Sequence, residues 1–327
     1  MARNNLEVVK KSRSDRYKVA EVKEKEKVTK TKTIKKKEKP KKEKEEIEEK
    51  EFNPILKKIL ISLIIIIVLF ISYSMFIEPN LLNVKEYKLE SNKISTNFHG
   101  TKIIQFSDLN YGTYFTEKDL IKLVDKINEL KPEILLFNGN LIDSNIKLDE
   151  NNTKILIKEL SRIDYPLYKY AVYGTNDYNQ TFEHIMNESG FTILDNESTL
   201  LYYKDEIPIV LYGFNLNKKE IDYNILNEPI DEIDTTKFYK IVLSHSPNII
   251  DNLKSHNPDL VLSGSTLGGL IDLEFTKPLF LNETKYYEDY YKINKTNLYI
   301  SNGLGTSNIN MRFNNVPSFN FFRLYKK

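Results

Sequence analysis

The most constraining feature of this sequence is one long apolar segment near its start. Residues Ile59–Ile77 are 19 consecutive positions without a charged side chain, with Lys57 and Lys58 before them and Glu78 after. At 1.5 Å per residue, a helix of this length crosses roughly the 30 Å hydrocarbon core of a bilayer. A water-soluble fold accommodates such a helix only by burying it on all sides. The segment therefore predicts a single transmembrane signal anchor, which we bound at residues 55–78.

The flanking charges predict the orientation of this helix. Lys57, Lys58 and the lysine-rich stretch before them place the amino end in the cytoplasm by the positive-inside rule, so the rest of the chain is expected outside it. A cleaved signal peptide is the alternative, because Ser72-Tyr73-Ser74 resembles a cleavage site. The long charged region before the apolar stretch argues against an ordinary signal peptide.

Residues 1–54 form a segment of a different kind, without glycine and without apolar periodicity. Residues 1–58 contain 21 Lys and Arg against 12 Asp and Glu, whereas the remainder contains 27 basic and 34 acidic residues. Such a segment buries too little apolar surface to offset its ordering entropy, so we predict a disordered Lys/Glu-rich cytoplasmic tail over 1–54. A basic arm that binds anionic lipid, nucleic acid or a partner is the alternative. The acidic run Glu45–Glu51 argues against it, and we expect no specific nucleic acid.

From residue 100 onward, short apolar runs alternate with helical patterns. Strands are predicted at 102–106, 134–138, 167–172, 208–212, 239–243 and 259–262, and helices at 116–130, 152–163, 180–189 and 248–254. Thr116 and Asp119 are typical of an N-terminal capping box. Such units predict an α/β domain whose chemistry lies at the carboxyl ends of its strands. The chain has no cysteine, which excludes disulfides, thiolate metal sites and cysteine nucleophiles.

Five short segments occur in a characteristic order at the ends of these runs. They are S-D-L-N-Y-G at 107–112, G-N-L-I-D at 139–143, Y-G-T-N-D at 173–177, L-S-H-S-P at 243–247 and S-G-S-T-L-G-G at 263–269. In order and spacing they resemble the signature blocks of the calcineurin-like metallophosphoesterases. That resemblance implies a four-layer αββα sandwich, which we place at residues 79–327.

The sequence outside the blocks is also similar to this family. Ile77-Glu78-Pro79 after the apolar segment, Tyr299–Gly305 and Met311-Arg312-Phe313 resemble a membrane-anchored bacterial subgroup. This resemblance implies a single-pass protein of the bacterial cell membrane with an extracytoplasmic domain. The membrane is then one expected partner, and an unknown protein or other envelope component is a second.

The resemblance also assigns roles to single positions, and most of them carry a replacement. Asp108 retains the carboxylate ligand of the first block, and His245 retains one imidazole ligand. Neutral side chains stand at the other metal-binding positions: Asn110 for a histidine, Asn140 for the bridging aspartate, Thr175 for an asparagine, and Ser265 and Leu267 for two histidines. A pair of divalent ions needs anionic ligands to offset its repulsion, which is on the order of 20 kcal/mol at an effective dielectric of 20.

The remaining polar residues of the blocks do not restore this chemistry. Asn176 stands where the family has the histidine that acts on the leaving group, so it is a vestige and no catalytic residue is expected. Asp143 and Asp177 occupy positions that lie behind the metal ligands in the family, and we expect them to brace turns. The other histidines lie outside the blocks and are expected to be ordinary surface residues: His99, His184 and His256.

These replacements predict a metallophosphoesterase-like domain that is catalytically inactive, acting as a binding or scaffolding module at the outer membrane face. No cofactor is expected for such a pseudoenzyme. The alternative is a residual phosphomonoesterase or phosphodiesterase that holds one divalent ion, Mn, Fe or Zn, on Asp108, Asn110, Asn140 and His245. A third interpretation places the function in the basic tail. Tyr286–Tyr291 is either a recognition surface or, as we prefer, a strand with one buried face.

Overall fold

The structure is a computed structural model that describes residues 53–203, 207–273 and 285–327. The predicted tail over 1–54 therefore lies almost wholly outside the described residues. The apolar segment forms helix α1, Pro54–Phe76, followed by the short 3-10 turn η2, Glu78–Asn80. Helix α1 is long and apolar enough to cross a membrane, and its side chains are almost entirely exposed.

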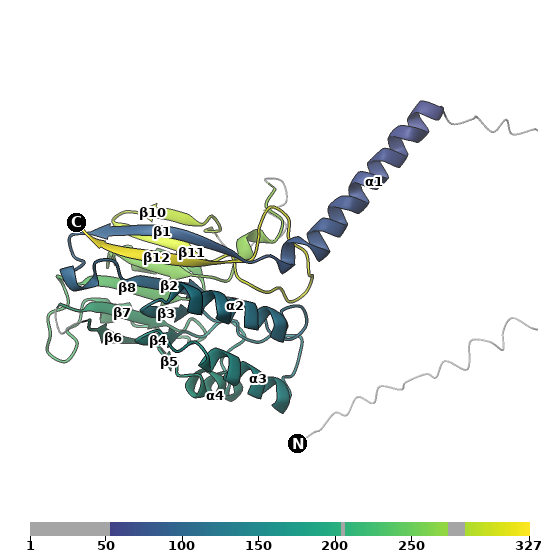
Figure 1. Cartoon of the computed structure of the whole chain (residues 1–327). Coiled ribbons are helices and arrows are strands. Elements are labelled where there is room, and N and C mark those ends of the chain that lie inside the picture. Colours follow the sequence, from purple (N-terminus) through teal and green to yellow (C-terminus); the bar gives the residue numbers. More distant parts are fainter. Residues whose placement is uncertain (1–52, 204–206, 274–284) are drawn as a thin grey trace, which may run out of the picture. The chain divides into compact units, whose positions relative to one another are not determined.

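Two six-stranded sheets form the body that follows α1 (Figure 1). The first sheet has the order β1-β12-β2-β3-β4-β5 and the second the order β10-β11-β9-β8-β7-β6. In the first sheet, the strands are β1 Asn83–Ser91, β2 Lys102–Phe106, β3 Ile134–Phe137, β4 Tyr168–Ala171, β5 Thr192–Ile193 and β12 Ser318–Lys326. In the second sheet, they are β6 Glu197–Leu201, β7 Ile209–Phe214, β8 Tyr239–Ser244, β9 Leu260–Ser263, β10 Tyr290–Ile293 and β11 Thr296–Ile300.

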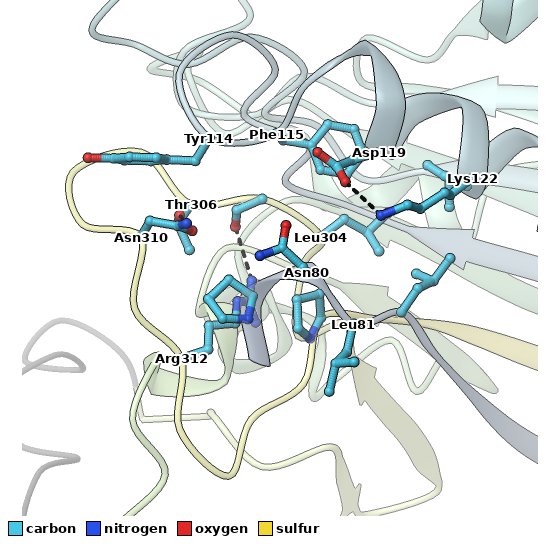
Figure 2. Close-up of a pocket in the computed structure, with 15 residues that line it drawn as sticks. Asn80, Leu81, Tyr114, Phe115, Asp119, Lys122, Leu304, Thr306, Asn310 and Arg312 are labelled. Carbon is cyan, nitrogen blue, oxygen red and sulfur yellow. Dashed lines mark hydrogen bonds and ion pairs between the residues drawn. The ribbon is translucent and has the colours of Figure 1, made fainter. Parts of the chain in front are cut away.

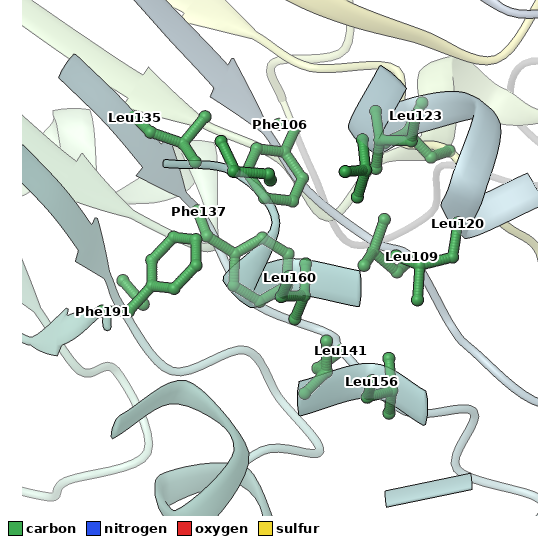
Figure 3. Packing of buried hydrophobic residues seen from close by; sticks show 14 of the residues in the cluster. Phe106, Leu109, Leu120, Leu123, Leu135, Phe137, Leu141, Leu156, Leu160 and Phe191 are labelled. Atoms are coloured by element: carbon green, nitrogen blue, oxygen red, sulfur yellow. The ribbon is translucent and has the colours of Figure 1, made fainter. Parts of the chain in front are cut away.

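The central strands are apolar on both faces because both faces are covered. In β3, Ile134 and Leu136 point into the core between the two sheets, whereas Leu135 and Phe137 point to the helices outside (Figure 3). Strand β7 alternates in the same way between the inner core and the core on the outer face of the second sheet. Side chains of a strand alternate between its two faces, so a doubly covered strand appears as a continuous apolar run.

Three helices cover the outer face of the first sheet: α2 Glu117–Leu130, α3 Glu150–Ser161 and α4 Gln180–Glu188. Helix α2 begins with the predicted capping box of Thr116 and Asp119, and buries Leu120, Leu123 and Ile127 against the sheet. The outer face of the second sheet is covered by the 3-10 turns η4, Tyr223–Leu226, and η5, Pro247–Ile249, with the short helix α5, Ile250–Leu253. Two sheets between two outer layers make the predicted four-layer αββα sandwich.

The predicted tyrosine-rich strand differs from the observed one. Strand β10 begins only at Tyr290, and it pairs antiparallel with β11 at the edge of the second sheet. Tyr286 precedes the strand and donates a hydrogen bond to Asp251, while its ring packs against Tyr291. The tyrosines therefore cover the margin of a core rather than forming one regular strand.

The register places the end of helix α1 and the carboxyl ends of the strands on the same side of the first sheet. Strand β1 starts at Asn83, which pairs with Ser318, and Asn320 in turn pairs with Gln105 near the carboxyl end of β2. Strands β3 and β4 run parallel to β2, so their carboxyl ends lie at that same end of the sheet. The loops that carry the signature blocks therefore face the end of the domain to which α1 is attached.

Candidate metal centre

Asp108 lies at the centre of the candidate site, in the loop directly after β2. Its side chain is buried, and both carboxylate oxygens accept hydrogen bonds from other signature blocks. Oδ1 accepts from the side-chain amide of Asn140 at 3.0 Å, and Oδ2 accepts from the backbone N–H of Ser265 at 2.9 Å. Three of the five blocks therefore meet at this one carboxylate.

His245 reaches the same carboxylate from the end of β8. Its Nε2 lies 3.8 Å from Oδ1 of Asp108, and its Nδ1 is 2.6 Å from the backbone carbonyl of Asn138. A carbonyl only accepts, so Nδ1 carries the proton, and in the neutral ring Nε2 presents a lone pair. Within the described residues, this buried Nε2 has no hydrogen-bond partner. The imidazole is therefore oriented as a metal-ligating histidine would be, with its ligating atom free.

The second and third blocks are locked together by backbone contact at two glycines. A Cβ atom placed on Gly139 would lie 2.2 Å from the backbone nitrogen of Gly174, and one on Gly174 would lie 2.5 Å from Oδ1 of Asn140. Neither position accepts a larger residue without a backbone shift. Thr175 and Asn176, which follow, are exposed, and the N–H of Asn176 donates to Oδ1 of Asn140 at 3.4 Å.

Asp177 fastens this junction from behind. Its buried carboxylate accepts hydrogen bonds from the backbone N–H groups of Asn140, Leu141 and Gly174. Burial raises the pKa of Asp177 to about 6, against the opposing effects of those amides and of His245. Asp143 does not join this cluster: its Oδ1 accepts from Asn145 in its own turn, while its buried Oδ2 has no partner among the described residues.

The last block places an apolar side chain inside the site. A Cβ atom on Gly303 would lie 2.6 Å from Cδ2 of Leu267 and 2.9 Å from Cβ of Asp108. Gly303 therefore packs closely against both the leucine side chain and the central aspartate. Its position carries a histidine ligand in the family's pattern, and leucine has no lone pair to offer.

The backbone at these positions is in the left-handed region. Asp108, Asn110, Asn140, Ser265 and Leu267 all have positive φ, between 44° and 73°. Asparagine tolerates this region, but for leucine it costs on the order of 1–2 kcal/mol. The loop of the last block therefore holds a strained backbone at Leu267. Asn110 lies within the cluster, because its backbone N–H donates to the carbonyl of Asn140.

The donor set does not fit a pair of metal ions. A binuclear centre needs a bridging carboxylate, and at that position the Asn140 amide donates to Asp108. Within the described ranges, no three His, Cys, Asp or Glu residues gather closely enough to hold a metal ion. Asp108 and His245 are the two remaining side chains with strong ligand atoms. They fit at most one ion, completed by amide oxygens or water.

A buried arginine behind the site was not assigned a role from the sequence. Arg312 donates to the carbonyls of Asn302 at 2.9 Å and Gly305 at 3.0 Å, in the loop whose N–H groups at 304 and 305 bond to the carbonyl of Asp108. Burial lowers the pKa of Arg312 to about 10, opposed by Asp108 and Glu78, so the group stays charged at neutral pH. The sequence signal that could have indicated this role is the single charged residue, Arg312, within the Met311–Phe313 run.

Asn315 and Glu78 extend this support to the end of α1. The backbone N–H of Asn315 donates to the buried carboxylate of Glu78, and its side chain donates to the carbonyl of Leu267 at 2.6 Å. The side chains of Asn302 and Asn315 also lie 2.8 Å apart. Glu78, two residues after the end of α1, is therefore two hydrogen bonds away from the strained loop of the last block.

A buried amide joins the two sheets beneath the site. Asn138 is fully buried and donates to the carbonyls of Ser244 at 3.0 Å and Leu262 at 2.7 Å, which lie in the other sheet. The three histidines outside the blocks lie away from this cluster. The ring of His99 packs against Tyr325, His184 lies in α4, and His256 contacts Asn227.

Loops after parallel strands of the two sheets bring Asp108 and His245 together. This arrangement is that of a phosphoesterase scaffold. The family model for calcineurin-like phosphoesterase matches residues 101–269, about half of the chain, and the chain belongs to that family. Members of this family normally use divalent metal ions.

Three relatives illustrate the range of the family. The metallophosphoesterase YkuE of Bacillus subtilis is 29% identical over 77% of this chain and 88% of its own length. The UDP-2,3-diacylglucosamine pyrophosphatase LpxG of Chlamydia trachomatis is 25% identical over 62% of this chain and 74% of its own length. A transmembrane protein with a metallophosphoesterase domain from Danio rerio is 23% identical over 70% of this chain and 54% of its own length.

Proposed function

We propose that this protein is a membrane-anchored family member that binds or scaffolds at the extracytoplasmic face and does not hydrolyse phosphoesters. Helix α1 is the single-pass anchor, residues 1–54 are a disordered cytoplasmic tail, and residues 79–327 are the domain outside. The observation that carries the proposal is the environment of Asp108. Both oxygens of this carboxylate are already engaged by neutral protein donors, Asn140 and Ser265.

Two further observations support a binding role. Leu267 packs on Gly303, which also approaches Asp108, and it stands at a position where the family has a ligand, so a second ion would lack that ligand. The candidate site also lies at the membrane-side end of the sheets, where a partner at the membrane surface could reach it. Exposed Thr175 and Asn176 offer hydrogen-bonding groups at its rim.

One observation favours a second candidate function, a hydrolase with a single metal ion. The free Nε2 of His245 and Oδ1 of Asp108 are 3.8 Å apart, as two ligands of one ion could be. Asn140 could turn its amide oxygen to such an ion after releasing Asp108. This candidate requires bound metal, whereas the scaffold does not.

Metal content separates the two candidates. The full-length protein, purified in mild detergent and dialysed, should hold fewer than one Mn, Fe or Zn ion per chain by elemental analysis. Added metal should leave its unfolding temperature nearly unchanged, since a ligand stabilises a fold only by binding to it. Two ions that survive dialysis would overturn the pseudoenzyme proposal. One ion lost on Asp108→Ala or His245→Ala would favour the mononuclear hydrolase.

Hydrolysis assays test the reason for inactivity. Wild-type protein should not cleave generic phosphomonoesters or phosphodiesters above a boiled control, with or without added metal. Single restorations should do little, because groups that act as a unit contribute non-additively. A variant that restores the family's ligands together with its leaving-group histidine, at Asn176, should gain bound metal: Asn110→His, Asn140→Asp, Thr175→Asn, Asn176→His, Ser265→His and Leu267→His. Wild-type activity that disappears with Asp108→Ala would instead assign the residual hydrolase.

A further inference from the structure

A second recess lies behind the candidate site, on the side of the first sheet that α2 covers. It is a small recess that is partly open to solvent, and we call it the membrane-side hollow (Figure 2). Its wall combines the chain just after α1, the start of α2 and the loop after β11, with lining residues that include Leu81, Leu82, Tyr114, Lys122, Leu304 and Arg312. No side chain of the five signature blocks lines it, so it is separate from the metal-site remnant.

Contacts of α1 place this hollow at the edge of the bilayer. The ring of Phe313 packs on Phe70 with centroids 4.5 Å apart, and the N–H of Arg312 donates to the carbonyl of Ser74 at 2.9 Å. Phe70 lies about 9 Å before the end of α1 at Phe76, at 1.5 Å per residue. A helix needs about 20 residues to cross a bilayer core, so the last turns of α1 must also lie within the bilayer if the helix spans it. The loop around Phe313 that contacts these turns therefore reaches the lipid headgroups.

Apolar side chains on this side of the domain are exposed to meet that lipid. Leu81, Tyr114 and Ile309 are exposed by 44%, 38% and 50%. Leu81 and Tyr114 line the hollow, and Ile309 is next to Asn310, which also lines it. Tyrosine is a typical residue of the membrane–water interface, where one end of its side chain is apolar and the other is wet.

Two cationic side chains, Lys122 and Arg312, line the hollow next to this apolar rim. Lys122 pairs with Asp119 at 3.2 Å, and Asp119 also accepts from Thr116 in the capping box, whereas Arg312 lies near the carboxylates of Asp108 and Glu78. Arg312 is fully buried, and its Nε–H has no partner among the described residues. Guanidinium and ammonium groups next to apolar surface suit a phosphate headgroup that continues into a hydrocarbon chain.

We propose that the membrane-side hollow binds one anionic phospholipid from the leaflet into which α1 emerges. The phosphate lies toward Lys122 and Arg312, and the glycerol and the upper acyl chain lie along Leu81 and Leu82. The proposal rests on α1 spanning a bilayer and not on the state of the metal-site remnant. The bound lipid attaches the domain to the membrane at a second point besides α1, and we call this contact the lipid seat.

Lipid retention tests the occupant. Full-length protein is reconstituted into nanodiscs with equal amounts of phosphatidylglycerol and phosphatidylcholine, released, and weighed by native mass spectrometry. We expect one retained phosphatidylglycerol per chain, and at least a tenfold loss of retention in Lys122→Glu. The matched control is Lys154→Glu, which reverses a charge in another exposed ion pair, on α3, and should retain the lipid. No retained lipid, equal retention of both lipids, or equal loss in both variants would overturn the proposal.

The position of the hollow relative to the bilayer is tested separately by tryptophan fluorescence. The chain has no tryptophan, so each introduced tryptophan reports on one position. Single tryptophans replace Leu81 at the hollow, Val68 within α1, or exposed Leu167, which precedes β4 at the opposite end of the sheet. Phospholipids brominated on their upper acyl chains should quench the Leu81→Trp and Val68→Trp fluorescence and leave Leu167→Trp unchanged. Quenching of Val68→Trp without Leu81→Trp would refute the lipid seat while leaving the membrane span intact. Without quenching of either, the membrane span itself fails, and the lipid seat with it.

Discussion

Replacing the buried arginine with methionine should severely weaken the fold. Arg312 is fully buried and donates to backbone carbonyls at 302, 303, 305 and 315. Methionine has a similar length and no donor, so Arg312→Met leaves these carbonyls with fewer partners and leaves buried Glu78 without its nearby cation. Removing one side of a buried charged network costs about 3–5 kcal/mol.

That loss is a large share of the 5–15 kcal/mol by which domains are typically stable. The measurement is urea unfolding of the full-length protein in mild detergent, followed by the near-ultraviolet circular dichroism of its 21 tyrosines. The midpoint should fall while the slope with urea stays constant, because the surface exposed on unfolding is unchanged.

An exposed arginine supplies the matched control. Arg323 pairs with Glu86 at 2.7 Å on the surface, so Arg323→Met should cost no more than about 1 kcal/mol. If Arg312→Met destabilises the protein no more than Arg323→Met does, the guanidinium does not support the loop after β11. The reasoning that connects α1 to the site through Glu78 and Asn315 would then be wrong as well.

Three other outcomes follow from features described above. Protease added to intact protoplasts should digest the domain after Glu78 and spare the tail, whereas a digested tail with a protected domain would reverse the orientation. Asn138→Ala should cost about 2–4 kcal/mol in the same urea assay, because it leaves two buried carbonyls without donors. Asp149→Ala should cost only about 1 kcal/mol, since it removes the N-cap bond to Asn152 at the start of α3, and an unchanged midpoint would argue against that cap.

The elements that could be predicted from the sequence are those with local signals. The pattern 102–106 is strand β2, and the capping box at Thr116 marks the start of α2. Three edge strands, β1, β5 and β6, were not predicted, because many of their side chains are polar and only partly buried. Strand β1 alternates lysine and glutamate over much of its length, which is typical of a strand that protects the edge of a sheet but gives no apolar period.

The site was predictable in its positions and less so in its contacts. The order of the blocks brings Asp108, Asn140 and His245 together, as the resemblance implied. The sequence alone does not indicate that the Asn140 amide turns toward Asp108, because side-chain direction depends on the finished backbone. It also does not place Asn138 beneath the site, since both of its partners lie more than a hundred residues further along the chain.

The place of β12 in the first sheet has a consequence for how the protein is made. Strand β12 lies between β1 and β2, although its residues are far from both in the sequence: Asn320 and its partner Gln105 are 215 positions apart. Until β12 joins the sheet, β1 has no partner strand and β2 has one unpaired edge, so the first sheet is incomplete. Pairing over such a long separation in sequence slows folding and exposes edges that aggregate. The domain should therefore fold slowly and be prone to aggregation until β12 has joined the first sheet.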